Sequence, residues 1–355
     1  MKPQNIIPPE LNGKAAPGQA APDNVALSNL NPRVRDKRSE ILDGLRQTQK
    51  SIDPKFFYDA RGSELFERIT GLPEYYPTRT ERGILESNAG EMAESCGKNC
   101  ILIEPGSGSS EKVRLLLDTL KPAAYVPMDI SADFLEQSAL LLAEEYPWLQ
   151  VHAVCADFAS LDTMPEELPA GRCVVFYPGS TLGNMKPGEA VEFLQRLGGW
   201  LNGDGGILIG IDLHKSTRTL EAAYNDGQGV TAKFNLNILD HVNTLVNADF
   251  DPASFSHRAF YNEEEQRIEM HLVSGKDQVV NLGDTRIGFT RGETIHTENS
   301  YKYTREKFRD VAQDAGFEIS SSWYDDNNLF AVHYLETAGK QGPGQGGCAG
   351  RLSTG

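Results

Sequence analysis

The alternation of short apolar runs with helical segments between residues 100 and 212 constrains the fold most strongly. The runs span residues 100–104, 124–129, 151–155, 173–177 and 206–212. Each run is typical of a buried strand, and segments with apolar residues at helical spacing lie between most of them. Strands that alternate with helices form βαβ units, whose parallel sheet is buried on both faces. The sequence therefore predicts an α/β fold with a Rossmann-like sheet.

The pattern changes after residue 212. Residues 213–245 have a helical pattern, residues 256–303 contain strand-like stretches with glycine turns, and the earlier pattern resumes at residues 305–335. We therefore expect a sheet domain interrupted by an inserted α+β substrate-binding domain. The expected parts are disordered tails at 1–30 and 337–355, a helical segment at 31–90 contributing to the substrate domain, the two parts of the sheet domain at 91–212 and 304–336, and the insertion at 213–303.

The charge balance limits the class of partner. The chain has 34 basic and 50 acidic residues, a formal charge of -16, whereas a nucleic-acid partner usually demands a basic face. No stretch is apolar enough for a membrane helix, and the first 26 residues lack the apolar core of a signal peptide. The five cysteines form no disulfide or zinc pattern. We expect a cytoplasmic monomer that acts on a small molecule, without metal, nucleic acid or membrane.

A glycine loop follows the first apolar run. The segment Glu104-Pro-Gly-Ser-Gly108 leads from the expected strand into a helix expected to begin near Ser110. Glycine lets the backbone approach a ligand closely and adopt positive φ, and a helix N-terminus offers free N–H groups to a carboxylate. Ligands of open parallel sheets bind beyond the carboxyl ends of the strands. The loop is therefore a candidate cofactor site.

Acidic residues follow the next two runs. Asp129 lies 23 residues after Gly106, where its carboxylate can accept both hydroxyls of a ribose, and Asp157 and Phe158 can supply an acid and an apolar wall for adenine. Together with the loop, they favour S-adenosylmethionine, which has a carboxylate and no phosphate. Three alternatives remain: ordinary turns with solvated acids, a binding module without catalysis, and a nicotinamide-dependent oxidoreductase. The last lacks support from the G-x-G-x-x-G pattern, because the third glycine is absent and Glu111 would lie close to a pyrophosphate.

Several long motifs resemble one enzyme family. They are Phe57-Tyr-Asp-Ala-Arg-Gly-Ser-Glu-Leu-Phe66, Leu72-Pro-Glu-Tyr-Tyr-Pro-Thr-Arg-Thr-Glu81, Gly106-Ser-Gly-Ser-Ser-Glu-Lys112, Phe176-Tyr-Pro-Gly-Ser-Thr-Leu-Gly-Asn184, Ala223-Tyr-Asn-Asp226, Gly229-Val-Thr-Ala-Lys-Phe-Asn235 and Arg267-Ile-Glu-Met270. They are similar to the histidine-specific N-alpha-methyltransferases of ergothioneine biosynthesis, over about residues 35–335. The resemblance implies S-adenosylmethionine as methyl donor and three methyl transfers to the α-amine of L-histidine, which give hercynine. One departure is Phe176-Tyr-Pro-Gly-Ser, where some members have Phe-Leu-Gly-Ser.

The resemblance also implies roles for single residues. The positions that match cofactor-binding residues are Tyr75, Gly106, Lys112, Asp129, Asp157 and Phe158. Those that match histidine-binding residues are Tyr58, Asn184, Tyr224, Glu298 and Ser300, with Gly179 and Met270 lining the site. An N-methyltransferase for a different amino acid or an aromatic amine stays open as an alternative.

The chemistry of these side chains suits those roles. The Asn184 amide and the Tyr224 hydroxyl can donate to a substrate carboxylate. Glu298 and Ser300 are two residues apart, so on a strand they face the same side and can bracket an imidazole. Tyr58 is the expected catalytic residue, which positions the amine first and relays a proton second, because a phenol with an ordinary pKa near 10 is a poor base at pH 7.

Overall fold

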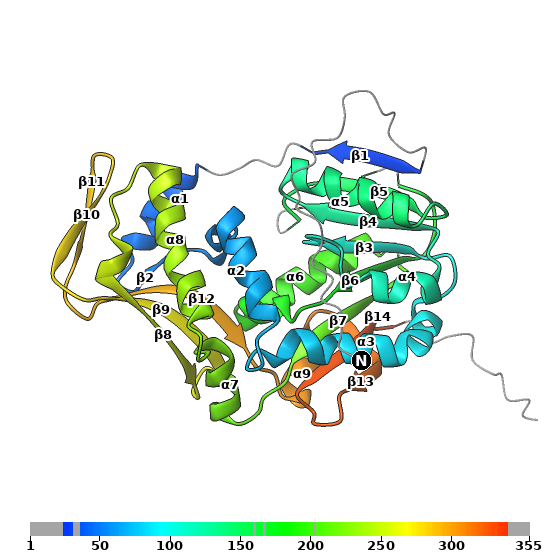
Figure 1. Cartoon of the computed structure of the whole chain (residues 1–355). Coiled ribbons are helices and arrows are strands. Elements are labelled where there is room, and N and C mark those ends of the chain that lie inside the picture. The colour runs from blue at the N-terminus through cyan, green and yellow to red at the C-terminus, as the bar shows by residue number, and fades with distance from the viewer. Residues whose placement is uncertain (1–23, 31–35, 159–160, 166–167, 202, 340–355) are drawn as a thin grey trace, which may run out of the picture.

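The computed structural model describes residues 24–30, 36–158, 161–165, 168–201 and 203–339. These residues form two units that lie side by side (Figure 1). The main unit contains an eight-stranded sheet, and the second unit contains a four-stranded sheet and a two-stranded hairpin. The disorder expected for residues 1–23 and 340–355 lies outside the described residues.

The main sheet confirms the predicted α/β class. Its strand order is β1-β5-β4-β3-β6-β7-β14-β13. The strands are β1 (Val25–Asn29), β3 (Ile101–Pro105), β4 (Ala124–Asp129), β5 (Gln150–Cys155), β6 (Cys173–Tyr177), β7 (Gly206–Asp212), β13 (Phe317–Tyr324) and β14 (Phe330–Thr337). The first six run parallel, and β14 is antiparallel to both β7 and β13. Strand order reverses between β3 and β6, which is where such sheets bind ligands.

Helices cover both faces of this sheet. One face packs against α3 (Tyr76–Cys96), α4 (Arg114–Leu120) and α5 (Ala132–Glu145), and the other packs against α6 (Pro187–Trp200) and α9 (Arg305–Asp314). Because both faces are covered, strands such as β3, β6 and β7 are buried along their whole length. Among the described residues, no helix combines the length and apolar character needed to cross a membrane.

The second unit is built mainly from the segment between β7 and α9. Its sheet has the order β2-β12-β9-β8, and β10 pairs with β11. The elements are α1 (Lys37–Leu45), β2 (Lys50–Ser51), η1 (Pro54–Phe57), α2 (Ala60–Thr70), α7 (Thr217–Tyr224), α8 (Val230–Val246), η3 (Pro252–Ser254), β8 (Phe255–Asn262), β9 (Arg267–Ser274), β10 (Gln278–Leu282), β11 (Thr285–Phe289) and β12 (Thr294–Tyr301). One hydrophobic core joins α1, α2 and α8 to the sheet.

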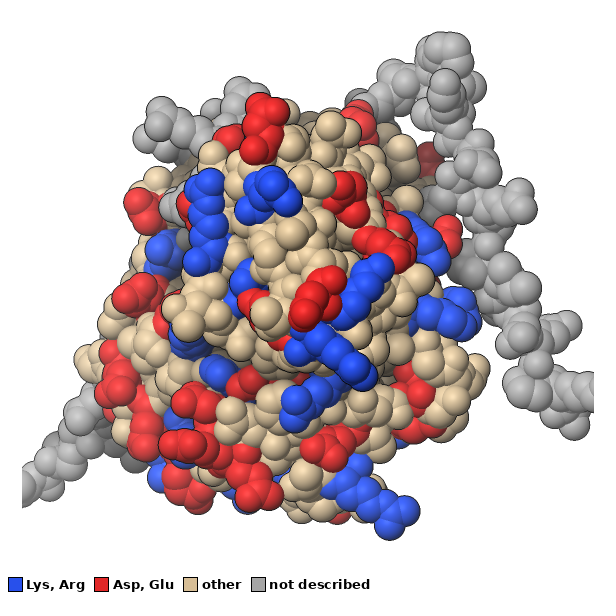
Figure 2. All heavy atoms as spheres, turned by 90° about the vertical axis from the view of Figure 1, so that its left-hand side faces the viewer, with Lys and Arg blue, Asp and Glu red and all other residues tan. Residues whose placement is uncertain are grey.

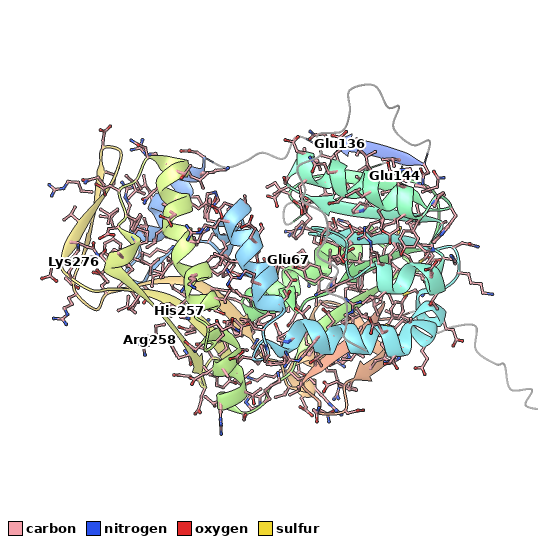
Figure 3. All side chains as sticks on the ribbon, viewed as in Figure 1. Glu67, Glu136, Glu144, His257, Arg258 and Lys276 are labelled. Carbon is pink, nitrogen blue, oxygen red and sulfur yellow. The ribbon has the colours of Figure 1, made fainter. Side chains whose placement is uncertain are left out.

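Labelled side chains show how this unit is oriented. Glu67 of α2 lies on the side that faces the main unit, whereas Arg258 and Lys276 lie at the outer margin (Figure 3). On the outer face, acidic and basic side chains are interspersed (Figure 2).

The chain leaves the main sheet and returns to it at one place. The backbone N–H of Tyr303 donates to the Asp212 carbonyl at 3.1 Å, and the N–H of His214 donates to the Tyr303 carbonyl at 2.9 Å. The segment between these points therefore starts and ends at an isolated parallel bridge between Leu213 and Tyr303, which ties the second unit to the end of β7.

Three sequence expectations are corrected. Residues 25–29 belong to the expected N-terminal tail but form β1, which pairs in parallel with β5. Leu27 is 49% exposed at this sheet edge, so the segment has little of the hydrophobic pattern of a buried strand. The expected helical segment 31–90 is divided: α3 packs on the main sheet through Ile84, Leu85 and Met92, and only the part before it joins the second unit. Finally, α4 begins at Arg114 and not near Ser110.

Candidate active site

The glycine loop lies at the carboxyl edge of β3. Gly106 and Gly108 have φ of 68° and 53°, a conformation that glycine adopts without strain. The Ser107 N–H donates to the Met128 carbonyl at 3.0 Å, which holds the loop against the end of β4. A Cβ atom on Gly106 would lie 3.4 Å from the ring of Phe158. The structure therefore brings together the loop and the residues that follow β4 and β5, as the sequence predicts.

Two acids support this loop from different sides. Glu104 is buried and accepts a hydrogen bond from the Tyr125 hydroxyl, so its carboxylate anchors β3 to β4. Burial raises the pKa of Glu104 to about 7, although Tyr125 opposes this rise. Asp129 ends β4, and burial also raises its pKa, which the backbone N–H groups of Ser131 and Gly108 partly offset. Asp129 is half-buried beside the loop, so its carboxylate can accept hydrogen bonds from the hydroxyl groups of a ligand.

Sequence reasoning missed Glu81, which organises the loops after β3 and β6. Its side chain is only 1% exposed. The carboxylate accepts a hydrogen bond from the Lys112 ammonium at 2.5 Å and another from the Gly179 N–H at 2.7 Å. Gly179 has φ of 85°, and a Cβ atom there would lie 3.1 Å from Lys112 Nζ. A Cβ atom on Gly210 would lie 2.0 Å from Glu81 Oε1. A carboxylate on the buried side of α3 was the signal for this role.

Tyr58 stands on a short turn between η1 and α2 that neighbouring residues fix. Asp59 caps α2 by accepting from the Gly62 N–H at 2.6 Å, and it also accepts from Asn237 of α8 at 2.8 Å. A Cβ atom on Gly62 would lie 1.7 Å from the Phe57 carbonyl oxygen, so this position requires glycine. The motif around Tyr58 therefore holds the backbone that presents it.

An aromatic wall runs from Tyr58 across the junction of the two units. Edge-on ring contacts join Tyr58 to Phe66 at 5.8 Å, Phe66 to Tyr75 at 6.4 Å and Tyr75 to Tyr224 at 6.3 Å. Tyr58 is 51% exposed, so a ligand can reach it. Surrounding protein and the charge of Glu298 nevertheless raise its pKa above the ordinary value. The phenol therefore stays protonated and is suited to hydrogen bonding, not to removing a proton.

Glu298 faces this wall because β12 contains a bulge. His296 pairs with His271 of β9 and Glu298 with Met270, which leaves Thr297 as the extra residue. In a regular strand, residues two apart share one face, whereas the bulge puts Glu298 on the face opposite that of His296. Met270 is buried in the core of the second unit opposite Glu298. Burial raises the pKa of Glu298 to about 7, although the Lys302 ammonium opposes this rise.

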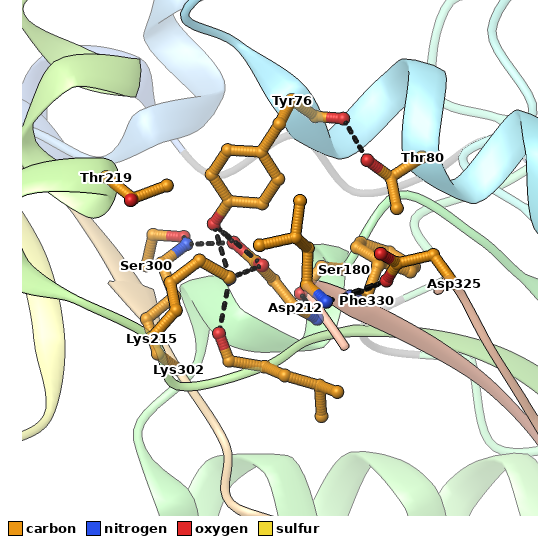
Figure 4. A network of polar contacts seen from close by, with 12 residues as sticks. Tyr76, Thr80, Ser180, Asp212, Lys215, Thr219, Ser300, Lys302, Asp325 and Phe330 are labelled. Atoms are coloured by element: carbon orange, nitrogen blue, oxygen red, sulfur yellow. Dashed lines mark hydrogen bonds and ion pairs between the residues drawn. The ribbon is translucent and has the colours of Figure 1, made fainter. Parts of the chain in front are cut away.

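A buried polar network lies beneath Ser300 and was also missed. Asp212, at the end of β7, accepts from Lys302 Nζ at 2.7 Å, from the Tyr76 hydroxyl at 2.8 Å and from Lys215 (Figure 4). Burial opposes the charge of Asp212, but the two lysines outweigh it and lower its pKa. Burial lowers the pKa of Lys215 to about 8. The signal in the sequence was an acid at the end of an apolar strand.

Tyr224 and Ser300 are joined to this network. The Tyr224 hydroxyl donates to Ser300 Oγ at 2.8 Å, and Lys302 donates to Ser300 Oγ at 2.7 Å. Tyr224 is buried, and its hydroxyl hydrogen is already bonded to Ser300. To donate to a substrate carboxylate, as we expected, Tyr224 would have to give up that bond.

Asn184 reaches the same junction from the main unit. It ends the short helix η2 (Thr181–Asn184), which packs against the end of β12 so closely that a Cβ atom on Gly183 would lie 3.0 Å from the Tyr301 carbonyl oxygen. Ser180 before it accepts from the Asp212 N–H at 2.8 Å. Asn184 is half-buried, and within the described chain its amide forms no hydrogen bond.

One other cluster has the composition of a metal site. Ligand atoms of Glu269, His271 and His296 lie within 4.8 Å of one another on the face of the sheet opposite Glu298. Several of these atoms already bond protein groups: Glu269 accepts from Arg267 and pairs with His271, and His296 bonds the Glu298 carbonyl. Among the described residues, Nδ1 of the buried His271 has no partner, and its ring stacks on that of His296 at 4.6 Å. The cluster lies outside the candidate site, and the expected absence of a metal stays a prediction.

Known proteins similar to this chain share the main part of its length. Residues 37–337 match the family described as "Histidine-specific methyltransferase, SAM-dependent". A histidine N-alpha-methyltransferase of Mycolicibacterium smegmatis is 41% identical over 83% of this chain and 93% of that protein. Ergothioneine biosynthesis protein 1 of Neurospora crassa is 31% identical over 82% of this chain, which spans 33% of that protein. A 4-dimethylallyltryptophan N-methyltransferase of Aspergillus fumigatus is 25% identical over 80% of this chain and 88% of that protein.

Proposed function

The chain belongs to the family of SAM-dependent histidine-specific methyltransferases, and on this premise we propose that it trimethylates the α-amine of L-histidine to hercynine, the first step of ergothioneine biosynthesis. The observation that carries the choice of histidine is the pair Glu298 and Ser300, which the bulge in β12 turns toward Tyr58 and Tyr224. An acidic acceptor and a hydroxyl on one face suit the two nitrogens of an imidazole.

The residues at the carboxyl edge of the main sheet fit the methyl donor. We propose that the Gly106–Gly108 loop accommodates its amino-acid part, that Asp129 accepts the ribose hydroxyls, and that Asp157 and Phe158 contact the adenine. The positive φ of both glycines and the approach of Phe158 to Gly106 support this assignment. Lys112 and Tyr75 complete the proposed site. The bound cofactor supplies a methyl group that its sulfonium makes electrophilic.

The second unit and η2 are proposed to hold the amino acid. The Asn184 amide has no partner among the described residues and is the proposed ligand of the substrate carboxylate, whereas Tyr224 keeps its bond to Ser300 and is proposed to act on the substrate through that hydroxyl. Gly179 has no side chain, which leaves space for the substrate beside Lys112, and Met270 of β9 is proposed to line the site directly opposite Glu298. In this arrangement we propose that residues 213–303, with residues 36 to about 75, form the substrate-binding domain.

Tyr58 is the proposed catalytic neighbour of the amine. Each transfer needs a free nitrogen lone pair, so one proton must leave the α-amine beforehand and pass to solvent. The raised pKa keeps the Tyr58 phenol protonated, but its oxygen retains a lone pair, and we propose that this oxygen accepts from the amine N–H and orients the nitrogen lone pair. Tyr58 is then a positioning group first, and most of the rate comes from alignment of the two substrates.

One experiment tests both acceptor and methyl count. Histidine and S-adenosylmethionine are incubated with the protein, and the product is weighed by mass spectrometry. The expected product carries three added methyl groups and no exchangeable hydrogen on the α-nitrogen. Faster methylation of another amino acid than of histidine would contradict the proposal.

A second candidate for the methyl acceptor is an amino acid with an indole side chain. The Aspergillus fumigatus relative, which is 25% identical, is named for the methylation of a tryptophan derivative, 4-dimethylallyltryptophan. The acceptor-specific features here are Glu298 and Met270, and tryptophan is therefore the competitor to test first. The nicotinamide-dependent alternative is set aside, because the chain belongs to a methyltransferase family.

We also propose that the protein acts in the cytoplasm as a monomer without a metal. The thiols of Cys96, Cys100 and Cys155 are buried and free, which suits a reducing compartment. Sedimentation of the purified protein tests its oligomeric state, and metal analysis of the active enzyme tests the absence of a metal.

A further inference from the structure

Lys302 uses every hydrogen of its ammonium group inside the site. Its Nζ donates to Asp212 Oδ2 at 2.7 Å and to Ser300 Oγ at 2.7 Å (Figure 4). It also donates to the Tyr224 hydroxyl at 3.3 Å. An ammonium has three N–H donors and no acceptor. Both hydroxyl groups must therefore turn a lone pair toward the lysine, which is 2% exposed.

The direction of the remaining bond follows from these contacts. The geometry of the Tyr224–Ser300 contact has the Tyr224 hydroxyl as the donor, at 2.8 Å. A serine hydroxyl has two lone pairs and one hydrogen. Lys302 and Tyr224 occupy both lone pairs of Ser300, so its hydrogen is left to donate. No acceptor among the described residues takes that hydrogen.

Ser300 and Glu298 then offer opposite hydrogen-bonding roles. Ser300 presents a donor, whereas ionised Glu298, two residues earlier on the same face, presents an acceptor. A neutral imidazole has one N–H and one bare nitrogen, and it matches this pair in only one of its two tautomers. An imidazolium has two N–H groups, one of which would face the hydrogen of Ser300.

Resting on the proposed function, we propose that Lys302 is a positioning residue that holds Ser300 as a donor and thereby selects the neutral histidine side chain, in the tautomer whose N–H faces Glu298. Asp212 anchors the lysine from the main unit. Lys215 binds the same carboxylate, but its other bonds go to the Tyr76 hydroxyl and the Leu213 carbonyl. It therefore does not orient Ser300, and it provides a matched control.

The test observes the bound ring directly. The wild-type protein is mixed with S-adenosylhomocysteine and with histidine carrying ¹⁵N in the ring, and NMR spectra are recorded at pH 8, where free histidine is neutral and exchanges between tautomers. In the complex we expect one protonated and one bare nitrogen at fixed positions. Two protonated nitrogens, or averaged tautomers, would overturn the role of Lys302.

Variants separate Lys302 from the other buried lysine. K302M should lose the single tautomer and weaken histidine binding about tenfold, while affinity for S-adenosylhomocysteine stays within about twofold. K215M should keep the wild-type nitrogen signals. If K302M does not fold, S300A is measured in its place, and it should also lose the single tautomer. Unchanged signals and affinity in K302M, or in S300A, would overturn the inference. A wild-type protein that does not bind histidine would contradict the proposed function itself.

Discussion

Asp212 and Lys302 form a buried ion pair with 2.7 Å between Oδ2 and Nζ, and both side chains are 1% exposed. Asp212 ends a strand of the main sheet, and Lys302 lies directly after β12 of the second unit, 90 residues later. The pair therefore joins the edge proposed for the cofactor to the strand proposed for histidine. We expect the relative placement of the two proposed substrates to depend on this ion pair.

Replacing Asp212 should destabilise the protein strongly. D212N leaves two buried ammonium groups without their carboxylate, and breaking a buried pair in this way typically costs about 3–5 kcal/mol. The free energy of unfolding from urea titrations measures the loss. The matched control is E86Q, which removes the exposed pair between Arg82 and Glu86 and should cost about 0.5 kcal/mol or less. Similar losses in the two variants would show that the buried network contributes little.

Replacing Gly106 should affect the cofactor and spare histidine recognition. Alanine at this position has an unfavourable positive φ and approaches the ring of Phe158. We expect G106A to cost about 1 kcal/mol in stability and to weaken S-adenosylhomocysteine binding at least about tenfold. Isothermal titration calorimetry provides the affinity, and G188A, at a position with nothing near the added carbon, is the control. Undiminished cofactor affinity in G106A would place the ligand elsewhere.

Removal of the Glu298 carboxylate should weaken histidine binding and spare cofactor binding, the reverse of the effect expected for G106A. E298A should weaken histidine binding by about 10–100-fold, the range expected for a hydrogen bond to a charged group, with cofactor affinity nearly unchanged. Titrations of each ligand measure both effects. Equal losses for histidine and cofactor would place Glu298 outside the substrate site.

The pH dependence of E298Q should reveal the raised pKa of Glu298. Since burial raises this pKa from 4.5 to about 7, the ionised folded form is disfavoured, and the wild type should lose stability relative to E298Q as the pH rises from about 4.5 through 7. At pH 8 we expect E298Q to be more stable by about 1–2 kcal/mol, a value reduced for the partial exposure of Glu298. Thermal melts at pH 4.5 and pH 8 measure this difference, and a constant difference would contradict it.

Ligand binding should change with pH in the opposite sense. Ionised Glu298 accepts the imidazole N–H, so histidine affinity should increase as the pH rises through about 7. In E298Q residue 298 does not ionise, so the change of affinity with pH comes from the titration of the histidine ring. The two affinity profiles are compared between pH 6 and pH 8.5, and parallel profiles would exclude Glu298 as the titrating group.

The local sequence determined the class of fold and much of the cofactor edge. Apolar runs such as residues 101–105 and 206–212 are strands because both faces of the sheet are covered, and the glycines at 106 and 108 adopt the positive φ expected of a tight loop. The carboxyl ends of parallel strands necessarily share one edge. Asp129 and Phe158 therefore come near Gly106 by topology alone. The resemblance of the motifs then identified the family.

The tertiary structure decided features that depend on distant partners. β1 exists only because β5 offers a free edge, and α3 is assigned to the main unit by the residues it packs against. The local sequence does not reveal the partners of Glu81, Asp212 and Lys302, because Gly179 lies 98 residues from Glu81 and Asp212 lies 90 residues from Lys302. The bulge at Thr297 is likewise a property of pairing with β9. Local propensity sets each element, but burial and hydrogen bonding between elements decide which charged groups meet.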